Sequence, residues 1–236
     1  MINKKITIIG LGYVGLSLAA FLGNQAKVIG IDSNKEKLRI IKKGESYFHE
    51  PKINYYLKKA IKNGTTFTDK ITNEITSSDF VFITVGTPIG KNGKIDLKNI
   101  KSVSKSIAKN MINLKNNPSI IIKSTVIPGT TMDIVKPILE KSNLKESTDF
   151  DLLTNPEFLK EGSAMQDTIL PHSIVIGGTN DKAIKKLTNL YKSVYRKKQK
   201  IVETNNITAE MIKYANNAFL ATKISFINSM ANICQK

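Results

Sequence analysis

The chain has 236 residues, and 41% of them are hydrophobic, which is enough to build one large domain, or one and a half, around a full core. No run approaches the roughly 18 apolar residues of a membrane span, and Met1 to Lys5 leads directly into an apolar stretch without a signal-peptide pattern. A single cysteine excludes an internal disulfide framework, and the cysteine and two histidines form no metal-ligand cluster. We therefore predict a cytoplasmic protein with no membrane partner and no metal site.

The formal net charge of +17 is a property shared with many nucleic-acid-binding proteins. Here the charge comes from lysine, because Arg39 and Arg196 are the only arginines. The lysines are scattered in the way that is typical of solvated helix faces. Their one dense basic cluster is Arg196, Lys197, Lys198 and Lys200. We predict no specific nucleic-acid partner, although weak, salt-sensitive binding to polyanions is expected.

The first apolar run leads into a glycine-rich turn. Residues Ile6–Ile9 are apolar or β-branched, the sequence Gly-Leu-Gly-Tyr-Val-Gly follows, and helix-compatible residues fill Tyr13–Leu22. This order predicts strand, tight turn and helix. Gly10 would allow the turn, Gly12 would let the backbone approach a pyrophosphate, and Gly15 would let the helix pack close to the strand.

The second apolar run, Val28–Ile31, ends at an acidic residue. Asp32 lies 22 residues after Gly10, where a carboxylate can accept hydrogen bonds from an adenosine ribose. Because that carboxylate would repel a 2′-phosphate and no arginine follows directly, the pattern favours NAD over NADP. The alternative is a glycine-rich turn followed by a surface aspartate, since the glycine motif alone is weak.

Strand-like and helix-like segments alternate along the chain, which predicts a doubly wound, mostly parallel, Rossmann-like α/β sheet. The strands are expected at Lys5–Ile9, Lys27–Ile31, Thr65–Phe67, Phe80–Val85, Ser119–Lys123, Leu152–Thr154, Ser173–Ile176 and Lys200–Val202. Besides the first helix, helical patterns include Asn34–Lys43, Ile53–Lys62 and Lys182–Tyr191.

Polar motifs follow three of these strands, at the edge of the sheet where the ligand crevice of such a fold lies. They are Gly86-Thr87-Pro88, Ser124-Thr125 and Asn155-Pro156-Glu157. Each of the first two could also be ordinary loop chemistry. Glu157 and Glu161 could instead cap a helix that opens after Pro156, because a helix dipole favours carboxylates in its first turn.

The last segment, residues 206–236, contains no Gly or Pro and reads as one long helix. Lys213 and Asn217 fall on one face of this otherwise apolar helix, and the alternative is a polar stripe facing water. Cys234 lies inside the apolar pattern, so we expect a buried, inert thiol. The pattern stops without a capping glycine, which suggests a truncated protein.

Taken in order, these motifs resemble the nucleotide-sugar 6-dehydrogenases, the family that includes UDP-glucose and GDP-mannose 6-dehydrogenases. The resemblance covers essentially all 236 residues. Its residues are Gly10–Gly15, Asp32, Glu50, Pro51, Val85–Pro88, Ser124–Val126, Pro128–Thr130, Asn155–Gly162, Glu210, Lys213, Tyr214, Asn217, Ala218, Phe219, Lys223, Phe226 and Asn228.

The resemblance implies the four-electron oxidation of a sugar C6 alcohol to a carboxylate with two NAD, through a thiohemiacetal and a thioester on a cysteine. It also implies catalytic roles for four residues. Glu157 would work with water in acid–base steps, Thr125 would help to hold that water, and Lys213 and Asn217 would stabilise oxyanion character at C6.

Substrate-binding and cofactor-binding residues are carried over in the same way. Glu157, Lys213 and Asn217 would also bind the substrate, together with Phe158, Leu159 and Lys160, which would line the sugar nucleotide. Glu161 would lie near the nicotinamide. The predicted cofactor-binding residues are Gly10, Gly12, Tyr13, Val14, Gly15, Asp32, Lys37, Gly86, Thr87, Pro88, Ser124, Thr125 and Glu161.

The predicted organisation is an NAD-binding domain over residues 1–203 and the start of a long central helix over 204–236. Cys234 does not match the family's nucleophile, and that cysteine segment and the C-terminal UDP-binding domain have no counterpart in these residues. We predict the NAD-binding part of a UDP-glucose 6-dehydrogenase of polysaccharide biosynthesis, inactive alone and dimeric through the helix. The alternatives are another nucleotide sugar, GDP-mannose or a UDP-N-acetyl-hexosamine, or a non-catalytic dinucleotide-binding module.

Overall fold

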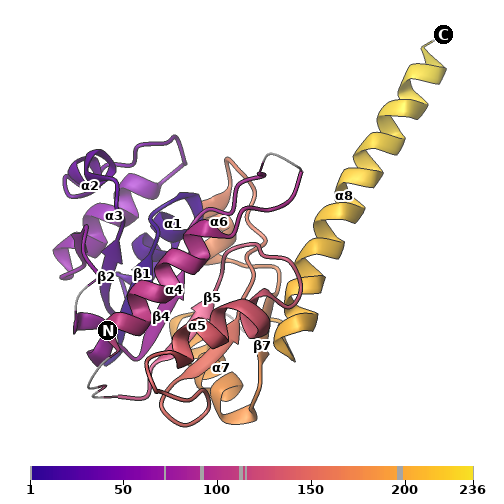
Figure 1. Ribbon diagram of the computed structural model, residues 1–236. Helices are drawn as coiled ribbons and strands as arrows, with labels where there is room; N and C mark the ends of the chain where they lie inside the picture. The colour runs from indigo at the N-terminus through magenta and orange to yellow at the C-terminus, as the bar shows by residue number, and fades with distance from the viewer. Residues whose placement is uncertain are drawn as a thin grey trace.

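The computed structural model describes residues 2–71, 73–90, 93–111, 114, 116–195 and 199–235. Figure 1 shows helices on both sides of a central sheet and one long helix, α8 (Asn206–Cys234), that leaves the rest of the chain. The sheet has eight strands in the order β3-β2-β1-β4-β5-β6-β7-β8. This confirms the doubly wound α/β fold that the alternating pattern predicts. Of the predicted basic cluster, residues 196–198 lie outside the described part of the chain.

The strands lie within one or two residues of the predicted ranges. All neighbouring pairs are parallel except β6 and β7, which run antiparallel through Leu153 opposite Gly178 and Thr154 opposite Gly177. The bounds are β1 (Lys5–Ile9), β2 (Lys27–Ile31), β3 (Thr66–Thr68), β4 (Phe80–Ile83), β5 (Ser119–Ile122), β6 (Asp151–Thr154), β7 (Ile174–Gly178) and β8 (Ile201–Thr204).

Helices α1 (Tyr13–Leu22) and α3 (Ile53–Lys62) have the predicted bounds, while α2 (Lys35–Ile41) is shorter and α7 (Asp181–Val194) longer than predicted. Five further elements complete the described domain, and the longest of them is a 13-residue amphipathic helix that buries Ile100, Ile107 and Ala108. They are η1 (Asn73–Ser77), a 3₁₀ turn, α4 (Lys98–Asn110), η2 (Thr130–Val135), a π-helical turn, α5 (Lys136–Glu140) and α6 (Ala164–Ile169).

Two apolar layers hold the sheet between the helices. Fully buried side chains of α1, α3, α6 and α7 cover one face, around Leu16, Leu57 and Leu187. Side chains of α4, α5 and η2 cover the other, around Ile107 and Leu139. Because both faces are covered, the central strands are apolar on both sides, and the polar groups gather where the strands end.

Only the first two turns of α8 are packed against the domain. Ala209, Glu210 and Lys213 are buried, whereas every described residue from Ala215 onward is exposed. Cys234 is therefore exposed, and the prediction of a buried thiol is wrong. The apolar pattern around Cys234 is real, but in the described chain this end of α8 packs against no other element. No described helix is long and apolar enough to cross a membrane.

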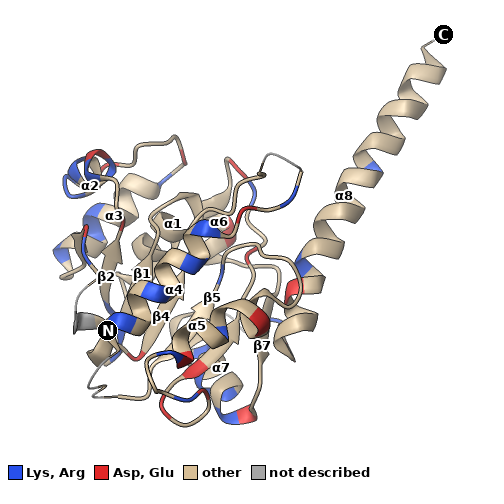
Figure 2. Cartoon of the chain, viewed as in Figure 1, with Lys and Arg blue, Asp and Glu red and all other residues tan. Residues whose placement is uncertain are grey.

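Charged residues are distributed unevenly between the domain and α8. Figure 2 shows lysines over several helices of the domain, including α3 and α4, and an α8 that is almost free of charge. Its only charged residues are Glu210, Lys213 and Lys223.

Candidate functional site

The glycine turn between β1 and α1 has the backbone geometry that a dinucleotide requires. Gly10 has a φ of +96°, in the left-handed region that favours glycine. A Cβ on Gly15 would lie 1.9 Å from the Gly10 carbonyl oxygen, so only glycine lets α1 pack this closely on the turn. A Cβ on Gly12 would meet nothing within 4 Å and would stand in open space beside the helix N-terminus. That open space is where a phosphate group can approach the backbone.

A cleft of about 750 Å³ extends from this turn across the carboxyl ends of β1, β2 and β4. Asp32 lies at its edge, and its carboxylate accepts hydrogen bonds from the Leu11 N–H at 2.8 Å and the Asn34 N–H at 2.9 Å. The predicted cofactor residues that line the cleft are Gly10, Gly12, Asp32, Lys37 and Gly86.

Hydrogen bonds join the loop after β4, whose Val85 and Gly86 line the cleft, to the loop after β5. The Ser124 hydroxyl donates to the Val85 carbonyl at 2.6 Å, and the Thr87 hydroxyl donates to the Thr125 carbonyl at 2.7 Å. The segments that contain Thr87, Ser124 and Thr125 are thus held together by these two bonds. The predicted roles of these three residues toward cofactor and water stay predictions.

Two residues far apart in sequence form an ion pair at the end of β6. The Lys213 ammonium of α8 lies 3.0 Å from a Glu157 carboxylate oxygen and 5.4 Å from the centre of the Phe158 ring. Both charged side chains are largely buried, at 7% and 14% exposed. A buried ammonium beside a carboxylate can stabilise an oxyanion and exchange a proton next to it.

Glu157 does not cap a helix, so that alternative is wrong. Residues 155–160 are irregular, and the next helix, α6, begins at Ala164. The Glu157 carboxylate accepts from the Leu159 N–H at 2.5 Å, and the Lys160 N–H donates to Asp167 at 3.0 Å. These local bonds take the backbone donors that a helix would need.

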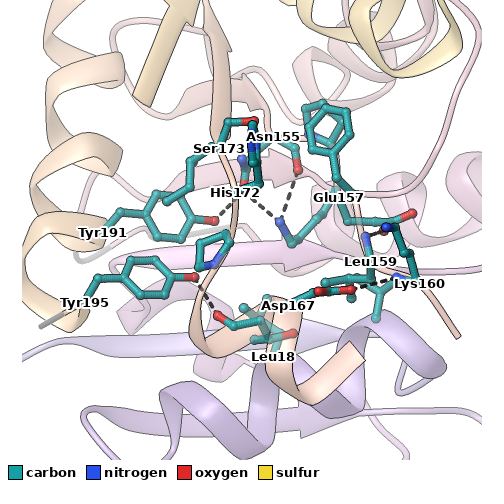
Figure 3. Close-up of a pocket in the computed structure, with 17 residues that line it drawn as sticks. Leu18, Asn155, Glu157, Leu159, Lys160, Asp167, His172, Ser173, Tyr191 and Tyr195 are labelled. Carbon is teal, nitrogen blue, oxygen red and sulfur yellow. Dashed lines mark hydrogen bonds between the residues drawn. The ribbon is translucent and has the colours of Figure 1, made fainter. Parts of the chain in front are cut away.

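A pocket of about 150 Å³ lies beside Glu157, and Figure 3 shows its polar side chains. The predicted residues Glu157, Phe158, Leu159 and Lys160 line it, and so does Val14. Val14 is predicted from the sequence to bind the cofactor, and that role stays a prediction.

Lys123, to which no sequence motif assigns a role, also lines this pocket. Its ammonium donates to the Asn155 side-chain oxygen at 3.0 Å, and the Tyr191 hydroxyl donates to the same oxygen. Burial lowers the pKa of Lys123 to about 8; the Glu157 carboxylate opposes this and the Lys213 ammonium adds to it. The available signal was a charged residue at the end of the apolar run Ser119–Lys123.

Three predicted site residues, Asn217, Glu161 and Tyr13, lie apart from the Glu157–Lys213 pair. Asn217 is exposed one turn beyond Lys213, where α8 has left the domain surface, and Glu161 is exposed in the loop before α6. Tyr13 follows the glycine turn, but its hydroxyl donates to Glu50 at 2.6 Å. Their predicted roles toward substrate and cofactor stay predictions.

Family models match nearly the whole chain. Residues 4–195 match the NAD binding domain of the UDP-glucose/GDP-mannose dehydrogenase family, and residues 207–236 match its central domain. The UDP-glucose 6-dehydrogenase TuaD of Bacillus subtilis is 40% identical over 99% of this chain and 49% of its own length. The UDP-glucose 6-dehydrogenase of Rickettsia felis is 37% identical over 98% of this chain and 50% of its own length.

Solved structures agree with these sequence relatives. A GDP-mannose dehydrogenase of Pseudomonas aeruginosa superimposes with a TM-score of 0.90 at 34% identity, over 94% of this chain and 51% of that one. A UDP-glucose dehydrogenase of Pyrobaculum islandicum gives 0.88 at 31% identity, over 97% and 52%. The chain spans about half the length of the relatives it matches. It belongs to the UDP-glucose/GDP-mannose dehydrogenase family, and residues 4–195 are the family's NAD-binding domain.

Proposed function

We propose that the chain is the NAD-binding half of a dehydrogenase that oxidises the C6 alcohol of a nucleotide sugar, with UDP-glucose as the substrate. The observation that carries the proposal is the buried Glu157–Lys213 pair at the carboxyl end of β6. A proton acceptor and an oxyanion stabiliser are the two groups that alcohol oxidation needs at the reacting carbon. The relatives named UDP-glucose 6-dehydrogenase support the choice of sugar.

The residues of this chain divide the work between cofactor and substrate. The fit of NAD rests on the open space at Gly12 and on the Asp32 carboxylate at the cleft edge. When bound, NAD accepts the hydride. Lys213 would then hold the substrate oxygen as negative charge develops, and Glu157 would accept its proton directly or through a water held near Thr125. Burial of the pair strengthens both interactions.

We propose that residues 1–203 and 204–236 are separate functional parts, and that these 236 residues alone bind NAD without completing turnover. The chain's half-length match to its relatives supports this view. The good superposition on a GDP-mannose dehydrogenase keeps GDP-mannose as a second candidate substrate. The cytoplasmic location and a role in polysaccharide biosynthesis stay predictions.

Calorimetric titration of NAD into the chain tests the cofactor site. We expect saturable binding that Asp32→Ala weakens at least about 30-fold, because a charge-assisted hydrogen bond is worth about 2 kcal/mol. Asp181→Ala, at the exposed start of α7, is the control and should bind as the parent chain does. The same samples should form no NADH from UDP-glucose. Normal NADH formation would contradict the proposed division of labour, and absence of NAD binding would contradict the cofactor assignment.

We also propose that α8 pairs with a second copy of itself. The exposed part of α8 has a single charged residue, Lys223. Its exposed large apolar side chains include Phe219, Ile224, Phe226, Ile227 and Ile233, and such an apolar surface is typical of an interface. Analytical ultracentrifugation should therefore find a dimer. The double variant Phe219→Lys/Ile227→Lys should be monomeric, and Tyr55→Lys, on the exposed face of α3, should stay dimeric. A clean monomer of the parent chain would overturn this proposal.

A further inference from the structure

The Tyr13 side chain connects the glycine turn to the segment that lines the proposed sugar site. Tyr13 is the first residue of α1, directly after Gly12. Its hydroxyl donates to a Glu50 carboxylate oxygen at 2.6 Å and accepts from the Gly162 N–H at 2.6 Å. The Lys160 carbonyl lies 3.1 Å from the same hydroxyl. A side chain of α1 thus contacts the loop that follows Glu157 directly.

Glu50 extends this connection to α6. The residue is buried, and its second carboxylate oxygen accepts from the Met165 N–H at 3.1 Å. Within the described chain, no lysine or arginine forms an ion pair with Glu50. A buried carboxylate held by a hydroxyl and an amide depends on both donors staying in place. Burial and the Glu50 carboxylate in turn raise the pKa of Tyr13 to about 12, which keeps the hydroxyl protonated.

The residues just before Glu50 also contact the glycine turn and the first residue of α1. The Tyr47 hydroxyl donates to the Leu11 carbonyl at 2.9 Å, and the Phe48 ring lies 5.0 Å from the Tyr13 ring. The Lys37 ammonium, which lines the dinucleotide cleft, lies 4.6 Å from the Tyr47 ring centre. The segment 47–50 therefore bridges the cleft and the sugar-lining loop through several independent contacts.

We propose that Tyr13 and Glu50 are positioning residues that couple NAD occupancy of the cleft to the order of the segment Phe158–Gly162. The inference rests on the proposed function, since it assumes that this segment lines the sugar. A dinucleotide on the glycine turn fixes the first turn of α1, and Tyr13 then holds the Gly162 amide. The segment lies outside the helices and strands, and Lys160, Glu161 and Gly162 are exposed, so it is the kind of segment whose order a ligand can shift. Cofactor binding would thus prepare the sugar side of the site.

Hydrogen exchange of the Gly162 and Met165 amides, measured with and without saturating NAD, tests the coupling. In the parent chain we expect NAD to slow the exchange of both amides about fivefold or more. Tyr13→Phe keeps the ring against Phe48 but removes the hydroxyl. It should abolish this NAD-dependent slowing when each chain is measured at an NAD concentration that saturates it in its own titration. Tyr55→Phe, a hydroxyl deletion at an exposed position of α3, should behave as the parent chain does.

Glu50→Gln provides a second variant if Tyr13→Phe folds poorly. Its amide group has one acceptor oxygen for two donors, so it should lose the NAD-dependent slowing at Met165. The proposal is overturned if NAD binds the parent chain without slowing these amides, or if Tyr13→Phe or Glu50→Gln retains the full effect. A parent chain that binds no NAD contradicts the cofactor assignment itself, and the titration reveals that case before any exchange is measured.

Discussion

Gly15→Ala is expected to destabilise the chain by about 2–3 kcal/mol, whereas Gly12→Ala should leave stability almost unchanged and weaken NAD binding more than tenfold. A Cβ on Gly15 would lie 1.9 Å from the Gly10 carbonyl oxygen and 2.5 Å from the Thr84 hydroxyl. The backbone of the turn must shift to make room, and such overpacking costs more than the helix propensity that alanine gains.

Gly12 is the matched control, because the two variants add the same methyl group three residues apart. Its φ of −70° suits alanine, and the new Cβ meets nothing within 4 Å. Loss of a glycine at the N-cap costs less than about 1 kcal/mol. The methyl group would, however, occupy the space where a pyrophosphate approaches. Urea unfolding and NAD calorimetry separate the two effects, and a stable Gly15→Ala or a Gly12→Ala with parental NAD affinity would contradict this account of the turn.

Glu210→Gln should lower the free energy of unfolding by about 2–4 kcal/mol. The buried Glu210 carboxylate accepts from the Gly129 N–H at 2.6 Å, and from the Thr131 N–H at 2.8 Å and hydroxyl at 2.6 Å. Burial raises the pKa of Glu210, and these donors oppose the rise. A glutamine must turn its NH₂ group toward one set of donors, which leaves a buried N–H without an acceptor. Such an unpaired group lowers the free energy of unfolding by about 1–3 kcal/mol.

Glu203→Gln is the control for the Glu210 variant. Glu203 is exposed on β8 and accepts one hydrogen bond, from the Thr188 hydroxyl at 2.6 Å. Its replacement should change the free energy of unfolding by less than about 0.5 kcal/mol. An equal effect of the two variants would mean that the bonds to Gly129 and Thr131 do not hold α8 on the domain. Because Lys213 lies one turn further along, the Glu210 variant should also disturb the Lys213–Glu157 pair.

Much of the fold could be predicted because local chemistry and tertiary packing agree. Buried strands such as β1 and β4 are apolar on both faces, and Tyr13–Leu22 and Ile53–Lys62 end at glycine or polar residues. The antiparallel direction of β7 could not be predicted, because an apolar run has no direction. A helix starting after Pro156 is not formed, because the Glu157 and Asp167 carboxylates accept from the Leu159 and Lys160 N–H groups and α6 begins only at Ala164.

The candidate site divides in a similar way. The glycine turn and Asp32 are local signals, and they line the cleft as expected. Glu157 and Lys213 are far apart in sequence, and only the family resemblance predicts that both belong to one site. Lys123 and the direction of the Tyr13 hydroxyl depend on neighbours from other elements, Asn155 and Glu50, and sequence spacing contains no information about them.

The uneven distribution of charge should make dimerisation through α8 depend on ionic strength. Each chain has a net charge of +17, almost all of it on the domain, while α8 beyond Lys213 has only Lys223. Two copies joined through α8 would repel one another through their domains without an ion pair at the contact to compensate. Added salt shortens the Debye length to about 8 Å at 0.15 M and screens that repulsion. Self-association should therefore become tighter as salt rises, which is opposite to the trend of an interface held by charges.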